Sequence, residues 1–149
     1  MTITCNVNTV ASSIAGLTIS GVTVKDIDEI PDTARMLAPI LIPATDYMSG
    51  TRMSFETFGS NGTAKVNMEY DLNYMFLYSE VGGINAFAPF SPLMTKLALV
   101  LETIMSNDKI NGLVDMRLNS VSNVGIITDP AGVQFWGVQI SLHVLEYSQ

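Results

Sequence analysis

The sequence is poor in charge. Charged residues make up 14% of its 149 residues and hydrophobic residues 48%, whereas an average soluble domain has about 25% charged residues. This length suits one domain spanning residues 1–149. Either that domain is unusually globular, or another subunit covers part of its apolar surface. We favour the second interpretation, because subunit interfaces resemble a core cut in half.

Cations are the scarcer of the two kinds of charge. Seven lysines and arginines stand against 14 aspartates and glutamates, which gives a net charge of −7 at pH 7. Seven cations spread along the chain do not make the basic stripe that contacts to nucleic-acid phosphates require. We therefore expect no direct affinity for nucleic acid.

Cysteine and long apolar runs are also rare. The single cysteine, Cys5, excludes an internal disulfide. Residues Met1–Thr4 have no basic residue of a secretory signal. No run approaches the ~18 apolar residues of a membrane span, and the longest apolar stretch, residues 36–44, contains Pro39 and Pro43. We expect no membrane contact, and a protein of the cytoplasm or one assembled from it.

Side chains suited to catalysis are few. His143 is the only histidine, and it falls inside a predicted strand, which favours a cross-strand or surface role over general-base catalysis. The sequence has no Gly-x-Ser-x-Gly elbow and no phosphate-binding glycine loop. One histidine and one cysteine do not complete a zinc shell. The acidic cluster Asp26–Asp32 lacks the glycine and final glutamate of a calcium loop. We expect no enzymatic activity, metal or cofactor, and a solvated loop at the acidic cluster.

The N-terminal segment has the spacing of a short amphipathic helix. Asn6 or Asn8 can serve as its N-cap, and Gly16 can end it. Its apolar positions recur three or four residues apart, and they are Val10, Ile14 and Leu17.

A second helix is predicted after the middle of the chain. Ser91 can cap it with Pro92 in the first helical position, and the helix runs to about Ser106. Its apolar stripe consists of Leu93, Leu97, Val100, Leu101, Ile104 and Met105.

The residues between these helices predict a long hairpin. Residues 52–58 have strand character, and Asn61-Gly62 is the strongest short-range hairpin signal. The return strand alternates over about fifteen residues, which would span about 50 Å, so a bulge bends it or one end projects. Its apolar side consists of Val66, Met68, Tyr70, Leu72, Tyr74, Phe76 and Tyr78, and its polar side of Lys65, Asn67, Glu69, Asp71 and Asn73.

Four further segments are predicted to be extended, and they are residues 18–27, 36–46, 113–127 and 133–147. Pro39 and Pro43 lie in the second of these, and because proline cannot donate to a ladder, any strand there is an edge strand. The last two segments flank a proline- and glycine-containing turn, so they predict a second hairpin. The final segment alternates, and its apolar face consists of Trp136, Val138, Ile140, Leu142 and Val144. The expected fold class is α+β, with a largely antiparallel sheet of two long hairpins packed in two layers by the N-terminal and central helices.

The loop before the second helix is rich in glycine, proline and phenylalanine. An apolar loop of this kind either packs under its own domain or docks on a neighbour, and both alternatives stay open. We take Phe87 and Phe90 in this loop, and Asn61 at the hairpin turn, as candidate residues of a subunit interface.

The order of these elements resembles the tail terminator and related neck or minor tail proteins of tailed bacteriophages. The features that carry the resemblance are the N-terminal helix, the Asn61-Gly62 hairpin continuing through Val66–Leu72, the helix opened by Ser91-Pro92-Leu93, and the closing strand Phe135–Val144. The resemblance is one of pattern and covers most of the chain.

This resemblance implies a structural protein of the virion, assembled in the host cytoplasm. It implies a homo-oligomeric ring, commonly a hexamer, that caps the tail tube and joins it to the neck or connector. DNA would pass through the centre without specific binding. A negative lumen repels phosphate, so Glu69 and Asp71 are candidate lumen-facing residues.

Three alternatives remain. The chain could be another tail or neck subunit, such as a tube or head-completion protein. It could be a small-molecule-binding module with an apolar pocket lined by Met68, Tyr70 and Trp136. It could also be an enzyme that uses aspartate or glutamate alone.

Overall fold

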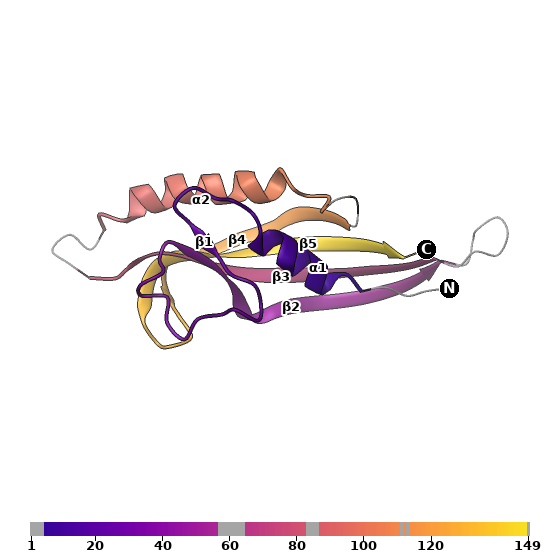
Figure 1. The fold of residues 1–149 in the computed structure, drawn as a ribbon, viewed down its shortest axis with the longest axis horizontal. Coiled ribbons are helices and arrows are strands. Elements are labelled where there is room, and N and C mark those ends of the chain that lie inside the picture. The colour runs from indigo at the N-terminus through magenta and orange to yellow at the C-terminus, as the bar shows by residue number, and fades with distance from the viewer. Residues whose placement is uncertain (1–4, 57–64, 83–86, 111, 113, 149) are drawn as a thin grey trace.

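The computed structural model describes residues 5–56, 65–82, 87–110, 112 and 114–148, and its helices and strands lie along one long axis (Figure 1). The fold is a mixed α+β fold, which confirms the expected class at that level. Its elements are α1 (Val7–Ala15), β1 (Thr23–Val24), β2 (Ile40–Glu56), β3 (Lys65–Glu80), α2 (Phe90–Met105), β4 (Val114–Thr128) and β5 (Gln134–Ser148).

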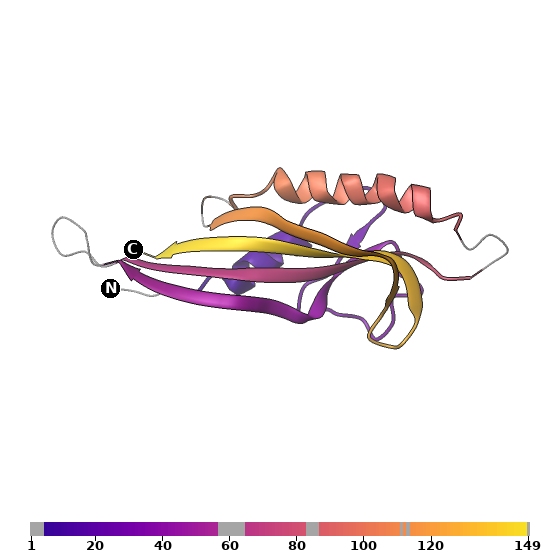
Figure 2. The same ribbon diagram turned by 180° about the vertical axis from the view of Figure 1, so that it is seen from behind.

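The five strands form one sheet in the order β1-β2-β3-β5-β4. The short strand β1 is parallel to β2, and the other neighbours are antiparallel. The pairing of β3 with β5 runs from Val66↔Ser148 to Glu80↔Phe135, so two segments far apart in the sequence make the centre of the sheet. The sheet curls at the end where β4 meets β5 (Figures 1 and 2).

The main hydrophobic core combines side chains of both helices with buried residues of the strands. Helix α1 contributes Val10 and Ile14, and α2 packs against β4 and β5. Figure 2 shows α1 behind the sheet, with α2 running along the β4 side. The alternation predicted for β3 and β5 is confirmed, because the buried strand residues of this core include Met68, Tyr70, Leu72, Tyr74, Phe76, Trp136, Val138, Ile140, Leu142 and Val144.

The opposite face of the sheet is apolar at its curled end. The polar alternation expected along β3 holds from Asn67 to Asn73, but Met75 and Leu77 on that same side are buried in a second core. The curl brings the segment before β2 and the β4–β5 hairpin over this face. The second core consists of Ala34, Ile40, Ile42, Ala44, Met75, Leu77, Ile127 and Phe135.

Asp129 joins two of the segments around this second core. Its side chain is buried, and its carboxylate accepts hydrogen bonds from the backbone N–H groups of Ala131 (3.0 Å), Val133 (2.8 Å) and Ala34 (3.0 Å). The first two bonds shape the β4–β5 turn, and the third ties that turn to the segment before β2. One carboxylate therefore holds the curled end together.

The expected bounds of β2 and α2 differ from the structure. The extended residues before Asp46 and the strand expected from Arg52 form one strand, β2, which continues through bulges after Pro43 and Ser49. Helix α2 begins at Phe90, after Pro89, and not at Pro92. Backbone geometry decides this point, because Pro89 already has helical dihedral angles.

The N-terminal helix agrees more closely with its prediction. It begins after Asn6, although the Asn6 side chain makes no capping hydrogen bond, and it ends at Gly16. Only two residues of the expected strand at 18–27 belong to β1. Among the described residues, no helix is long and apolar enough to cross a membrane.

Candidate functional site

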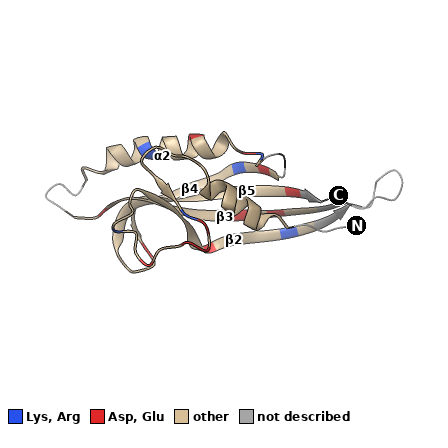
Figure 3. Ribbon diagram, in the orientation of Figure 1, with Lys and Arg blue, Asp and Glu red and all other residues tan. Residues whose placement is uncertain are grey.

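The polar face of the sheet carries a row of charged side chains across three strands. Arg52 on β2 lies 3.3 Å from Glu69 on β3, and Glu69 lies 3.2 Å from the Nε2 atom of His143 on β5. The Nδ1 atom of His143 lies 2.8 Å from Asp71. Figure 3 shows charged residues on β2, β3, β4 and β5 in this half of the sheet.

Strand register produces this cluster. Asp71 is directly opposite His143, and Arg117 on β4 is opposite His143 on its other side. Residues opposite one another in an antiparallel pair share a face and approach within about 5.5 Å. The register therefore gathers groups that are more than 70 residues apart in the sequence.

His143 is engaged at both ring nitrogens. Carboxylates only accept hydrogen bonds, and a neutral imidazole has one N–H, so it can donate to Glu69 or to Asp71 but not to both. A doubly protonated ring can donate to both. Activation of a nucleophile would instead require one ring nitrogen to face a hydroxyl or thiol. The geometry is that of a cross-strand polar cluster, which agrees with the cross-strand role expected for His143.

A shallow groove adjoins the cluster on the β4 side. Asp115, Arg117 and the loop residues Asp108 and Lys109 line it together with Glu69 and His143. Lys109 forms an ion pair with Asp115. Charges of both signs alternate along this surface, so Glu69 and Asp71 do not form an isolated negative patch.

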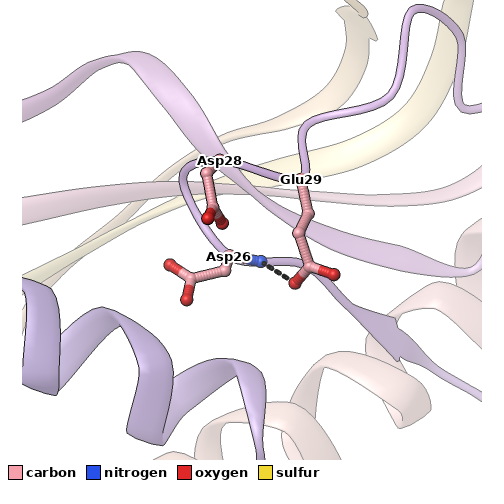
Figure 4. Close-up of side chains that lie close together, drawn as sticks. All are labelled: Asp26, Asp28 and Glu29. Carbon is pink, nitrogen blue, oxygen red and sulfur yellow. Dashed lines mark hydrogen bonds between the residues drawn. The ribbon is translucent and has the colours of Figure 1, made fainter.

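The acidic loop after β1 is a separate cluster. Oxygen atoms of Asp26, Asp28 and Glu29 lie within 4.8 Å of one another, and Figure 4 shows the three side chains around one turn of the loop. Carboxylate oxygens suit calcium or magnesium. Two contacts already engage Asp26, because its carboxylate accepts hydrogen bonds from Ser12 (3.0 Å) and from the backbone N–H of Ile27 (2.7 Å). The exposed Asp28 and Glu29 agree with the solvated loop that the sequence predicted.

The two candidate interface phenylalanines lie beside one buried tryptophan. The ring centroids of Phe87 and Phe90 are 5.6 Å and 6.5 Å from that of Trp136. Phe87 is 75% exposed and Phe90 43% exposed, so their outer surfaces remain open to solvent. The Nε1 atom of Trp136 has no hydrogen-bond partner among the described residues. The third candidate, Asn61, lies outside the described residues.

The proposed pocket residues do not come together. Met68 and Trp136 both lie in the main core, but Met68 is opposite Glu146 and Trp136 is opposite Ser79 on the same pair of strands. Eleven residues of β3 separate these positions, which is about 35 Å of strand. They therefore line no common pocket with Tyr70.

A buried carboxylate at the end of β5 was not predicted from the sequence. Glu146 is 1% exposed, accepts a hydrogen bond from the Tyr70 hydroxyl at 2.5 Å, and accepts another from the Asn6 backbone N–H at 2.8 Å. The signal was available, because Glu146 continues the two-residue period of the buried β5 residues. Burial, followed by the hydrogen bond and charge of Glu146, raises the pKa of Tyr70 far above its ordinary value.

Comparison with protein-family models and with curated proteins finds no match for this chain.

Proposed function

We propose that this protein is a structural subunit of a bacteriophage tail, which assembles as a homo-oligomeric ring, capping the tail tube and joining it to the neck or connector. The order of elements supports the proposal. The observation that carries it is the placement of the exposed apolar side chains. One set belongs to β2 and the segment between β1 and β2, and it comprises Ile27, Ile30, Met36, Leu37 and Met53. The other set belongs to α2, the residue Phe87 before it, and β4, and it comprises Phe87, Phe90, Met94, Leu118, Val124 and Ile126.

Exposed apolar side chains on two unlike parts of the chain suit a head-to-tail contact between copies. A two-fold dimer uses the same patch on both partners, whereas a heterologous contact joins two unlike patches and closes into a ring when the rotation allows. Apolar surface of this kind also accounts for the low charge content, because the core of a subunit interface is depleted of charged residues.

The proposed architecture has two layers, with both helices on one face of the sheet. That arrangement leaves the polar face with Glu69 and Asp71 for the lumen of the ring, through which DNA would pass without specific binding. Arg52 partly compensates the charge of Glu69, and His143 contacts both carboxylates. The resulting surface offers phosphate no continuous cationic stripe, which suits sliding rather than binding. A hexamer is the proposed ring size, and the virion is the proposed location.

Sedimentation velocity and negative-stain electron microscopy of the purified protein, alone and mixed with tail tubes, test the proposal. We expect closed rings with a central hole, either free or at one end of the tubes. A protein that stays monomeric at every concentration and does not bind the tubes would overturn it.

The lumen assignment has its own test. Phage carrying Glu69→Gln and Asp71→Asn together should assemble tails but eject DNA more slowly, because the surface loses negative charge. Unchanged ejection would count against the assignment of this face while leaving the ring intact.

A further inference from the structure

The two long edges of the sheet differ in how they are protected. On β4, the backbone N–H groups of Val114 and Met116 donate to the carbonyls of Lys109 (3.2 Å) and Asp108 (2.9 Å) in the preceding loop. That loop therefore covers the first part of the β4 edge. On β2, strand β1 pairs only with Ile40 and Leu41, and within the described residues no other strand pairs with the outer edge.

An open strand edge is a site for association with another chain. Unpaired backbone groups favour the addition of a partner, and proteins usually block such edges. The exposed residues of β2 are 45–46 and 50–53, and among them Met53 is 54% exposed. In the part of the chain that the structure describes, the β2 edge beyond Leu41 is thus bare and the β4 edge carries a loop, which makes them unlike surfaces.

Arg52 and Asp115 lie on opposite edges but in the same row of the sheet. The register joins Arg52 to Glu69, Glu69 to Leu145, and Leu145 to Asp115. Residues joined in this way share one face. Arg52 and Asp115 therefore lie at the same height along the strands.

These two residues also carry opposite charges and remain accessible. The Arg52 side chain is 76% exposed and that of Asp115 is 44% exposed. Arg52 is the only cation among the described side chains of β2. Each has one partner within its own chain, Glu69 for Arg52 and Lys109 for Asp115, and each keeps a side that faces outward.

We propose that the β2 edge of one copy docks on the β4 edge and its 107–110 loop in the next copy, with Arg52 of the first beside Asp115 of the second. The inference rests on the proposed ring with the polar face toward its lumen. The ring axis then runs parallel to the strands, and rotation about such an axis keeps each row of residues at its own height. Arg52 therefore meets Asp115 without a shift along the strands.

The contact extends the charge alternation of a single subunit across the boundary. Within one copy, Lys109 is beside Asp115, and Arg52 is beside Glu69. Joining the copies places Asp115 between Lys109 and Arg52, and Arg52 between Asp115 and Glu69, so that each arginine or lysine in the row has an anion next to it. If the β2 edges of two copies met instead, Arg52 of one copy would face Arg52 of the other, and the two like charges would repel. The charges in this row therefore also favour head-to-tail association.

Charge exchange tests the contact. We expect Arg52→Glu and Asp115→Arg each to raise the protein concentration at which half of the subunits are in rings by about tenfold or more, because each puts like charges at every boundary. The double variant should recover most of the loss, since it restores an opposite-charge pair in reversed order. Arg35→Glu is the matched control, because Arg35 is also an exposed arginine in an ion pair, with Glu80 at 3.3 Å, and it should assemble as wild type.

Sedimentation velocity over a concentration series gives the ring fraction, and urea unfolding of each monomer separates lost association from lost folding. Rings that form equally well in the wild type and both single variants would overturn the Arg52–Asp115 contact but leave the proposed function standing. The contact would also be overturned if the double variant formed rings as poorly as the two single variants do. A wild-type protein that forms no ring at all would instead remove the proposed function.

Discussion

The hydroxyl of Tyr70 on β3 and the carboxylate of Glu146 on β5 form a buried hydrogen bond of 2.5 Å inside the main core. The same carboxylate accepts the Asn6 backbone N–H at the start of α1. One acidic side chain therefore links the two central strands to the N-terminal helix. A buried polar group is stable when its hydrogen bonds are made and costly when they are not.

Removing this carboxylate should destabilise the fold. Glu146→Ala leaves the Tyr70 hydroxyl and the Asn6 N–H without their acceptor, and we expect a loss of about 2–4 kcal/mol in the free energy of unfolding. Glu146→Gln keeps an acceptor and should lose less. Urea unfolding measures both, with the exposed Glu102→Ala as the control. Equal stability of Glu146→Ala and Glu102→Ala would contradict the structural role of Glu146.

The protein should lose stability at alkaline pH. Burial, the largest cause, raises the pKa of Tyr47 to about 12, although its hydrogen bond with Tyr74 (2.8 Å) lowers it in part, and the charge of Asp26 raises it. Burial also raises the pKa of Tyr74 well above its ordinary value. The pKa values of Tyr47 and Tyr74 in the folded state exceed the ordinary tyrosine value of 10.0. The stability that comes from keeping these two hydroxyls protonated is therefore fully present below about pH 10 and is lost as pH rises toward 12.

Unfolding by urea between pH 8 and pH 12, together with tyrosinate absorbance, measures this effect. The variant Tyr47→Phe removes one of the raised groups, so its stability should fall less steeply above pH 10. A wild-type protein with constant stability up to pH 12 would show that these hydroxyls are not held neutral by burial.

Asp129 should be needed at the curled end of the sheet. Asp129→Ala removes the acceptor for the backbone N–H groups of Ala34, Ala131 and Val133, and we expect a loss of about 2–4 kcal/mol. Asp129→Asn keeps one acceptor oxygen and should be intermediate. Hydrogen exchange should show faster exchange at Ala34 and Val133 in the alanine variant. Protection that is unchanged at both amides would contradict the link between the turn and the segment before β2.

Gly137 on β5 should tolerate no side chain. A Cβ atom at this position would lie 2.3 Å from the backbone carbonyl oxygen of Phe76 on the neighbouring strand, so Gly137→Ala forces the two strands apart. We expect a loss of about 1–3 kcal/mol, the usual cost of overpacking. Gly16→Ala is the control, because its nearest contacts would be ordinary ones of 3.5 Å or more. If both variants unfold at the same urea concentration, the close approach at Gly137 is wrong.

Local pattern explains much of the fold. The two-residue period of β3 and β5 and the helical spacing of Leu93, Leu97 and Val100 predicted which side chains are buried. These patterns are local, because side-chain direction follows from the geometry of one strand or one helix. Glu146 continues the same period, but its burial was not predicted because a charged side chain favours a surface position.

The cluster of Glu69, Asp71 and His143 could not be predicted from local pattern alone. The sequence predicted that Glu69 and Asp71 share the polar side of a strand and that His143 lies in another strand. It did not indicate that His143 sits between them, because that depends on the register of strands more than 70 residues apart. A shift of one residue would move His143 to the opposite face.

The sequence by itself therefore determined that β3, β5 and the two helices form and which side chains of each pack in the main core, because these follow from spacing along a short stretch of chain. Only the tertiary structure decided that β5 lies between β3 and β4, that the sheet curls over a second core at Met75 and Leu77, and that Arg52 and Asp115 share one row on opposite edges. These features depend on pairing between distant segments, in which backbone hydrogen bonds and burial are optimised together over the whole sheet.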